Sequence, residues 1–293
     1  MPRGFDFSFP RYLAAKKTVD DRALNGYVWQ TLVEALPDGP RDVLEVGAGI
    51  GTMVERLMAR GILPPGSRYT AIDGDAVAVN AARQRLQPLR GLTLELEVTT
   101  LAGFAARADE HRHWDLLLAN AFLDLVHLER ALEQLLALLR PGGLFYFTIN
   151  FDGATIFEPV LDPALDAQIE RLYHETMDVR RQDGRPTGGS RTGRHLFQAL
   201  QTAGADLLAA GSSDWVVFPG INGYEADEAY FLHAIVHMMA QALEGHLQLD
   251  AAQFGDWIAA RHAQIDAHEL VYIAHQLDFV GRRTSSHDPS TAR

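Results

Sequence analysis

An acidic residue and three closely spaced glycines are the residues most suited to binding a nucleotide-type ligand. Glu45 precedes Gly47, Gly49 and Gly51, which follow it at two-residue intervals. Glycines let the backbone turn sharply and let a ligand lie against bare peptide, and the unpaired N–H groups at the start of a helix attract negative charge. A carboxylate at residue 45 repels a pyrophosphate but suits a cationic amino group. The pattern therefore predicts a nucleotide-type site for a ligand with a positively charged part.

A strand and a helix are predicted on either side of these glycines. Residues 43–46 form a short apolar run, and Met53, Val54 and Leu57 follow the glycines at helical spacing. In a strand–loop–helix unit of this kind the ligand lies at the carboxyl end of the strand. The third glycine comes one residue earlier than the dinucleotide fingerprint Gly-x-Gly-x-x-Gly requires. This spacing argues against a dinucleotide as the ligand.

A second acid, Asp73, ends the next predicted strand, residues 67–72. It follows the glycines by about 20 positions, the distance at which βαβ nucleotide sites place an acid that holds two ribose hydroxyls. Gly74 leaves room for an adenine ring, and Asp75 is predicted to cap a helix that begins at Ala76. Adenosine fits such a site whichever cofactor carries it.

The stretch Val-Leu-Glu-Val-Gly-Ala-Gly-Ile-Gly at residues 43–51 resembles the first motif of the class I S-adenosylmethionine (SAM) methyltransferases, which is apolar-apolar-Glu/Asp-apolar-Gly-x-Gly-x-Gly. A second landmark of that family, the turn before strand five, matches Leu-Arg-Pro-Gly-Gly-Leu at residues 139–144. The resemblance implies an α/β fold: a Rossmann-like seven-stranded sheet, parallel with one antiparallel edge strand, flanked by helices. It covers residues 43–149 and, more loosely, 194–280.

The resemblance also implies SAM as the cofactor and S-adenosyl-L-homocysteine as the product. Thr100 follows the predicted third strand, where the family often has an Asp for the adenine amino group, and Asn120 ends the predicted fourth strand. The predicted cofactor-binding residues are Glu45, Gly47, Ala48, Gly49, Gly51, Asp73, Gly74, Thr100, Asn120 and Ala121.

Four units are expected along the chain. Residues 1–40 form an N-terminal helical lid segment, and residues 41–218 with 269–282 form the SAM-binding core. Residues 219–268 are predicted to be a helical cap inserted between strands six and seven, where it encloses the substrate. Residues 283–293 are polar and are expected to be a disordered tail.

The acceptor is predicted to be a small molecule, and residues 178–194 suggest one with a carboxylate or phosphate. This segment has several arginines among glycines, and guanidinium groups bind such anions in a bidentate way, although a solvated connection would have the same composition. Our hypothesis assigns acceptor binding to Tyr12, Arg191 and Arg194.

Histidines are the candidates for a catalytic base, which a hydroxyl or ammonium acceptor needs and a carboxylate does not. The candidates are His233, His237 and His275, and Glu158 is a further candidate. The first two are spaced i, i+4, as in some zinc sites, but the rest of a metal motif is missing, so no metal is predicted.

Composition limits the other function classes. The formal net charge of -12 opposes nucleic acids and anionic membranes as partners. No apolar run approaches the ~18 residues of a membrane span, no secretory signal is evident, and a cytoplasmic location is expected. The chain has no cysteine, which excludes cysteine-dependent methylation of cytosine C5. A homodimer is left open. The prediction is a SAM-dependent methyltransferase (EC 2.1.1 class); the alternatives are an NAD-dependent oxidoreductase and a non-catalytic SAM-binding protein.

Overall fold

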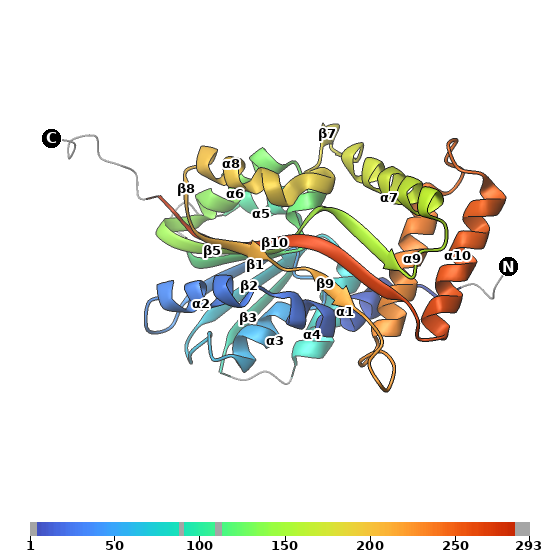
Figure 1. The fold of residues 1–293 in the computed structure, drawn as a ribbon. Coiled ribbons are helices and arrows are strands. Elements are labelled where there is room, and N and C mark those ends of the chain that lie inside the picture. The colour runs from blue at the N-terminus through green and yellow to red at the C-terminus, as the bar shows by residue number, and fades with distance from the viewer. Residues whose placement is uncertain (1–4, 88–90, 109–112, 285–293) are drawn as a thin grey trace.

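The structure is a computed structural model that describes residues 5–87, 91–108 and 113–284. One mixed eight-stranded sheet lies between helices (Figure 1). Its strands are β1 (Asp42–Val46), β2 (Arg68–Asp73), β3 (Thr93–Val98), β4 (Trp114–Asn120), β5 (Leu139–Glu158), β8 (Ala205–Ser212), β9 (Trp215–Val217) and β10 (Val271–Arg283). A separate hairpin consists of β6 (Arg181–Gln182) and β7 (Arg185–Pro186).

The helices alternate with the strands along most of the chain. They are α1 (Phe9–Ala23), α2 (Gly26–Ala35), α3 (Thr52–Ala59), α4 (Ala76–Leu86), α5 (Leu101–Ala105), α6 (Leu128–Leu138), α7 (Pro163–Asp178), α8 (Thr192–Thr202), α9 (Glu228–Leu243) and α10 (Ala251–Asp266). Two short 3-10 helices, η1 (Leu123–Leu125) and η2 (Gly189–Arg191), complete the described elements.

The strand order β3-β2-β1-β4-β5-β10-β8 confirms the predicted Rossmann-like class. Strands β1 to β5 pair in parallel, and β10 runs antiparallel between β5 and β8, one place inside the edge. The sheet has eight strands rather than seven because the region predicted as strand six, residues 205–218, forms two strands, β8 and β9, which both pair with β10. The carboxyl ends of β1, β2 and β4 consequently lie together at one edge of the sheet.

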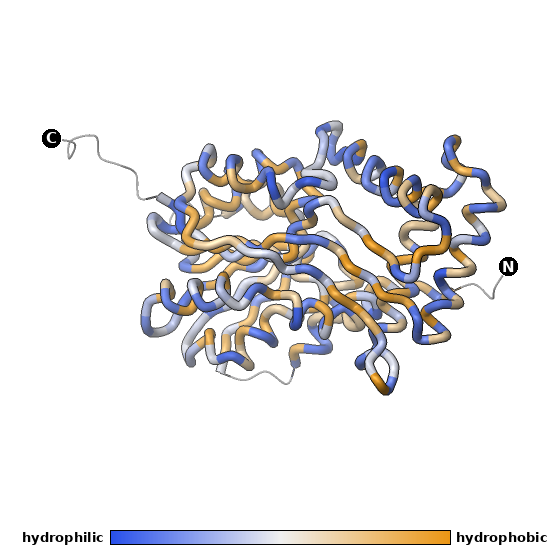
Figure 2. Tube along the Cα trace, viewed as in Figure 1, coloured by the Kyte–Doolittle hydropathy of each residue, from blue (hydrophilic) through white to orange (hydrophobic). Residues whose placement is uncertain are grey.

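On each face of the sheet, a cluster of buried apolar residues packs helices against the strands. Apolar residues lie along the strands and on the helix sides that face them (Figure 2). On one face α2, α3 and α4 pack against residues such as Val43 and Tyr69. On the other face α5, α6 and α8 pack against residues such as Leu44 and Phe147. The predicted apolar side of α3 is buried here, which fixes the helix directly behind the glycine loop.

Helix boundaries in the first third of the chain follow from local capping. The leading segment forms two helices because the Asn25 side chain accepts hydrogen bonds from the N–H groups of Tyr27 and Val28 and so starts α2. Asp75 caps α4 in the same way, as predicted.

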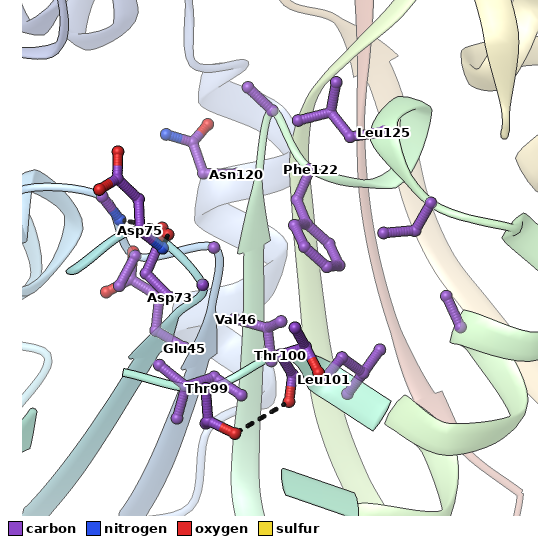
Figure 3. A pocket seen from close by; sticks show the side chains of 18 of the residues that line it. Glu45, Val46, Asp73, Asp75, Thr99, Thr100, Leu101, Asn120, Phe122 and Leu125 are labelled. Carbon is purple, nitrogen blue, oxygen red and sulfur yellow. Dashed lines mark hydrogen bonds between the residues drawn. The ribbon is translucent and has the colours of Figure 1, made fainter. Parts of the chain in front are cut away.

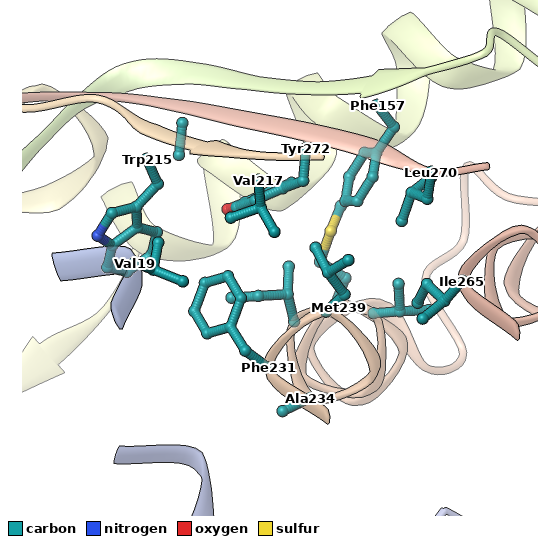
Figure 4. Packing of buried hydrophobic residues seen from close by; sticks show 14 of the residues in the cluster. Val19, Phe157, Trp215, Val217, Phe231, Ala234, Met239, Ile265, Leu270 and Tyr272 are labelled. Atoms are coloured by element: carbon teal, nitrogen blue, oxygen red, sulfur yellow. The ribbon is translucent and has the colours of Figure 1, made fainter. Parts of the chain in front are cut away.

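A third apolar cluster lies beyond the core sheet, where β5 and β10 extend as a long antiparallel pair that ends at Val271 opposite Glu158 (Figures 1 and 4). Phe157 and Tyr272 on these strands pack with Phe231 of α9 and Trp257 of α10. The segment predicted as a helical cap, residues 219–268, thus contains α9 and α10. Helix α7 and the second half of β5 were not predicted.

Two further observations concern the chain as a whole. Apart from Arg283 and Thr284, the predicted tail, residues 283–293, lies outside the described residues. Among the helices that the structure describes, none combines the length and the apolar character needed to cross a bilayer.

Candidate active site

A cavity of about 450 Å³ opens at the carboxyl ends of β1, β2 and β4 (Figure 3). Nine of the ten residues predicted to bind the cofactor line it: Glu45, Gly47, Ala48, Gly49, Asp73, Gly74, Thr100, Asn120 and Ala121. The tenth, Gly51, lies behind them as the N-cap of α3, with a φ of 80°. The sequence therefore identified most of one side of the cavity.

The glycine loop is bare backbone that a side chain would obstruct. Gly47 has a φ of +70°, and a Cβ built on it would lie 2.6 Å from Cδ2 of Phe122. Gly49 has a φ of +54°, and its Cβ would lie 3.0 Å from Cδ1 of Leu13. Both positions require the left-handed backbone that glycine adopts without strain. The two glycines therefore allow Phe122 and Leu13 to pack against the loop, and all four residues line the cavity.

Glu45 is a buried acid in the wall of this cavity, with 2% of its surface exposed. The Tyr69 hydroxyl donates a hydrogen bond of 2.7 Å to its Oε2. Burial raises the pKa of Glu45 to about 7; the Tyr69 bond and the Arg56 charge oppose this rise, and Asp73 adds to it. Near neutral pH the Glu45 carboxyl group is therefore about half ionised, and a nearby cation would favour its ionised form.

Asp73 is held in place by the main chain at the end of β2. Its Oδ2 accepts a hydrogen bond of 2.8 Å from the N–H of Gly49, and its Oδ1 accepts one of 2.8 Å from the N–H of Asp75. Each carboxylate oxygen can accept a further hydrogen bond. The geometry thus presents two fixed acceptors to the cavity, as binding of a vicinal diol requires.

The ends of β3 and β4 supply the remaining polar wall. Asn120 Oδ1 accepts a hydrogen bond of 3.0 Å from the Thr148 hydroxyl, which orients its amide. Ala121 follows with a φ of 50°, a backbone conformation uncommon for alanine that turns the chain at the strand end. Thr100 caps α5 by accepting from the N–H of Gly103.

Helix α1 covers the cavity with residues on one of its faces. Phe9, Leu13 and Lys16 are spaced i, i+4, i+7, and all three line the cavity. Tyr12, predicted to contact the acceptor, is not among the lining residues. It lies in the third apolar cluster, where its ring stacks on Phe231 at a centroid distance of 5.8 Å.

The opposite side of the mouth consists of residues that the sequence analysis did not select. His127, Arg130 and Gln134 contribute from the start of α6, and Gln182, Asp183 and Arg185 contribute from the β6–β7 hairpin. The arginine-rich segment 178–194 was noted, but the arginine that reaches the cavity is Arg185. Arg191 and Arg194 do not line it, and Arg194 forms an ion pair of 2.8 Å with the buried Asp152. The only local signal was the Asp183-Gly184 pair, which is typical of a two-residue hairpin turn.

The predicted catalytic histidines are distributed over other parts of the structure. His233 Nδ1 lies 2.7 Å from His262 Nδ1 between α9 and α10, and His237 stacks on Phe7 at 5.1 Å. His275 contacts Asp214 at 2.8 Å. None of the three lines the cavity, and their catalytic role stays a prediction. Within the described ranges no three His, Cys, Asp or Glu side chains are arranged to hold a metal ion.

The lining residues fit adenosine joined to a cationic amino acid. Asp73 provides the diol acceptors, the bare loop at Gly47 and Gly49 provides space, and Glu45 matches an ammonium group. The volume falls within the range of about 300–1,000 Å³ for small-molecule sites. Two carboxylates beside the loop oppose the pyrophosphate of a dinucleotide.

Comparisons with known proteins agree with this assignment. Residues 44–145 match the family described as "Methyltransferase domain". A crystal structure of a Bacillus halodurans protein described as a methyltransferase is similar over 89% of this chain and 100% of its own, with 11% identity and a TM-score of 0.53. The Bacillus subtilis protein YcgJ is similar over 88% of this chain and 97% of its own, with 10% identity and a TM-score of 0.51.

Because the sequence identities are this low, the similarity to these two structures shows only that the folds are alike. No curated protein matches the chain significantly. The family match nevertheless spans β1, the glycine loop, β2 and β4, which build the cavity. Residues 44–145 therefore carry a methyltransferase domain, and the lining of the cavity that they build fits SAM as the cofactor.

Proposed function

We propose that the protein is a SAM-dependent methyltransferase that acts on a small-molecule acceptor with a carboxylate or phosphate group. The observation that carries the proposal is a pair of guanidinium groups, Arg130 of α6 and Arg185 of the β6–β7 hairpin, that line the cavity from two elements. Neither has an ion-pair partner among the described residues. In a chain of net charge -12, two uncompensated cations at one cavity favour an anionic ligand.

We assign each cofactor-binding role from the place at which the residue lines the cavity. Glu45 binds the amino group of the methionine tail, and Asp73 accepts hydrogen bonds from the two ribose hydroxyls. The loop at Gly47 and Gly49 lies against the tail, Asn120 and Ala121 border the reacting centre, and Thr100 with Gly74 borders the adenine. The support is the placement of these residues at the same edge of the sheet (Figure 3).

Catalysis in this proposal rests on alignment and on exclusion of water. When bound, SAM supplies the electrophilic methyl group. Phe9, Leu13, Phe122 and Leu125 form apolar walls that hold the acceptor in line and exclude water from the cavity. A carboxylate acceptor needs no base. For a hydroxyl or ammonium acceptor, His127 is the histidine that borders the cavity and could accept the proton.

The experiment is a methyl-transfer assay with labelled SAM against metabolites grouped by charge. We expect label transfer to carboxylate- or phosphate-bearing acceptors, and we expect Arg185→Ala and Arg130→Ala each to raise the acceptor KM about tenfold. Arg194→Ala is the matched control, because Arg194 pairs with Asp152 and does not line the cavity. Equal KM values for Arg185→Ala and Arg194→Ala would refute an anionic acceptor. SAM binding without transfer to any compound would instead favour the non-catalytic alternative.

A further inference from the structure

The cavity wall carries a buried lysine that faces the same space as Glu45. Lys16 lies on α1 in the same row as Phe9 and Leu13, and 8% of its side chain is exposed. Burial of an ammonium group costs free energy unless charges or hydrogen bonds compensate it. Its position in a ligand cavity therefore calls for a partner of opposite charge.

Asp20 is the ion-pair partner of Lys16, whose Nζ also lies 5.2 Å from the centroid of the Trp215 ring and interacts electrostatically with Asp124. Asp20 Oδ2 lies 3.0 Å from the Lys16 Nζ, but the same carboxylate is 3.7 Å from Arg56 Nη2. Its other oxygen accepts a hydrogen bond of 2.9 Å from Nε1 of Trp215. One buried carboxylate is thus shared by two cations, and an ammonium group has three N–H donors. Lys16 keeps donors available for an anion in the cavity.

The two walls of the cavity match the two charges of an amino acid. Glu45 enters from β1 and Lys16 from α1, and the side-chain-free loop at Gly47 and Gly49 borders the same space. An α-amino acid carries an ammonium and a carboxylate on one carbon, so it presents opposite charges a few ångströms apart. We propose that Lys16 binds the carboxylate of the SAM methionine tail and makes the site specific for a cofactor with an intact amino acid. This proposal rests on the function proposed above.

Lys17 provides a matched control on the same helix. The chain has only these two lysines. Lys17 forms an ion pair of 2.7 Å with Asp21, is 31% exposed and does not line the cavity. Replacement of either lysine leaves its aspartate in contact with Arg56. The two Lys→Met variants differ in access to the ligand and in the burial of the replaced side chain.

The test compares SAM with decarboxylated SAM, which lacks only the carboxylate, by calorimetry. Lys16→Met should weaken SAM binding about 10- to 100-fold, as expected for a charge-assisted hydrogen bond, and leave decarboxylated SAM within about twofold. Lys17→Met should change neither. Glu45→Gln should weaken both ligands, because both retain the amino group.

Other outcomes overturn the proposal in distinguishable ways. An unchanged SAM affinity in Lys16→Met would show that Lys16 makes no contact, and an equal loss for both ligands would show that it acts only by shaping the site. If the wild-type protein bound neither ligand, the proposed function would fail first. Should Lys16→Met not fold, wild-type protein can be acetylated with an amine-selective reagent: SAM should protect Lys16 and not Lys17, and decarboxylated SAM should protect Lys16 less. Equal protection by both ligands would count against the carboxylate contact.

Discussion

Substitution of Glu45 by glutamine should stabilise the ligand-free protein at alkaline pH while weakening SAM binding. The folded-state pKa of Glu45 is raised from 4.5 to about 7, mainly by burial. Because Glu45 binds its proton more tightly in the folded state than in the unfolded chain, protonation of Glu45 stabilises the fold. This stabilisation is fully present below pH 4.5 and is lost as the pH rises through 7. The pKa difference corresponds to about 3 kcal/mol at about 1.36 kcal/mol per pKa unit.

Urea unfolding of both proteins between pH 5 and pH 8 measures this effect. The glutamine keeps an acceptor for the Tyr69 hydroxyl but has no charge, so between pH 5 and pH 8 the difference in unfolding free energy should shift by about 2–3 kcal/mol in favour of the variant. Glu34→Gln, on the exposed surface of α2, controls for the loss of one acid. A pH-independent difference between Glu45→Gln and wild type would refute the reasoning that a buried charge is held at this site.

The same carboxylate should make SAM binding release protons. A cofactor ammonium beside Glu45 favours the ionised form, so at pH 7 binding should release about half a proton, because half of the groups are protonated when the pH equals the pKa. Calorimetry in two buffers with different ionisation enthalpies gives this number directly. Proton release on SAM binding should vanish in Glu45→Gln. If the variant still released protons, the titrating group would be a residue other than Glu45.

Two more perturbations probe the loop and the helical extension. Gly47→Ala should cost about 1–3 kcal/mol of stability, because its φ is +70° and its Cβ meets Phe122 at 2.6 Å. It should also lower SAM affinity about tenfold, because Phe122 lines the cavity and has to move. Gly61→Ala has the same φ of +70° with nothing within 4 Å of its Cβ, so it should leave affinity unchanged; equal effects on affinity would contradict the role of Gly47 in packing the cavity wall. Burial, together with the nearby His233 and His237, lowers the pKa of His262 to about 4, and Asp266 opposes this shift. Because the unfolded chain then binds the proton more readily, the free energy of unfolding should fall as the pH drops from 6.5 towards 4. With solvent screening allowed for, we expect a loss of roughly 1 kcal/mol. Thermal unfolding of His262→Gln should lack that loss, and an identical acid profile would reject the histidine pair as its source.

The cofactor side of the cavity was predictable because its signals are local. The strand, the bend at Gly47 and Gly49 and the following helix lie within about 16 consecutive residues, and left-handed φ values explain why glycines occur there. Asp73 was found because the length of a βαβ unit fixes the spacing between the first loop and the end of the second strand.

The acceptor side depends on contacts between segments far apart in sequence, which no local pattern specifies. Arg185 lines the cavity because β6 and β7 pair as a hairpin beside it, whereas Arg194 forms an ion pair with Asp152 on β5. The helical spacing of His233 and His237 correctly predicted one helix face, but that face packs on Phe5, Phe7 and His262. The second half of β5, which was not predicted, continues to Glu158 because β10 pairs with it.

Titration of the protein with SAM and, separately, with NAD in a calorimeter distinguishes the two cofactors. We expect saturable binding of SAM and no binding of NAD, because Glu45 and Asp73 beside the glycine loop match a cation and a diol and repel a pyrophosphate. Saturable binding of NAD, or the absence of any heat with SAM, would contradict this expectation.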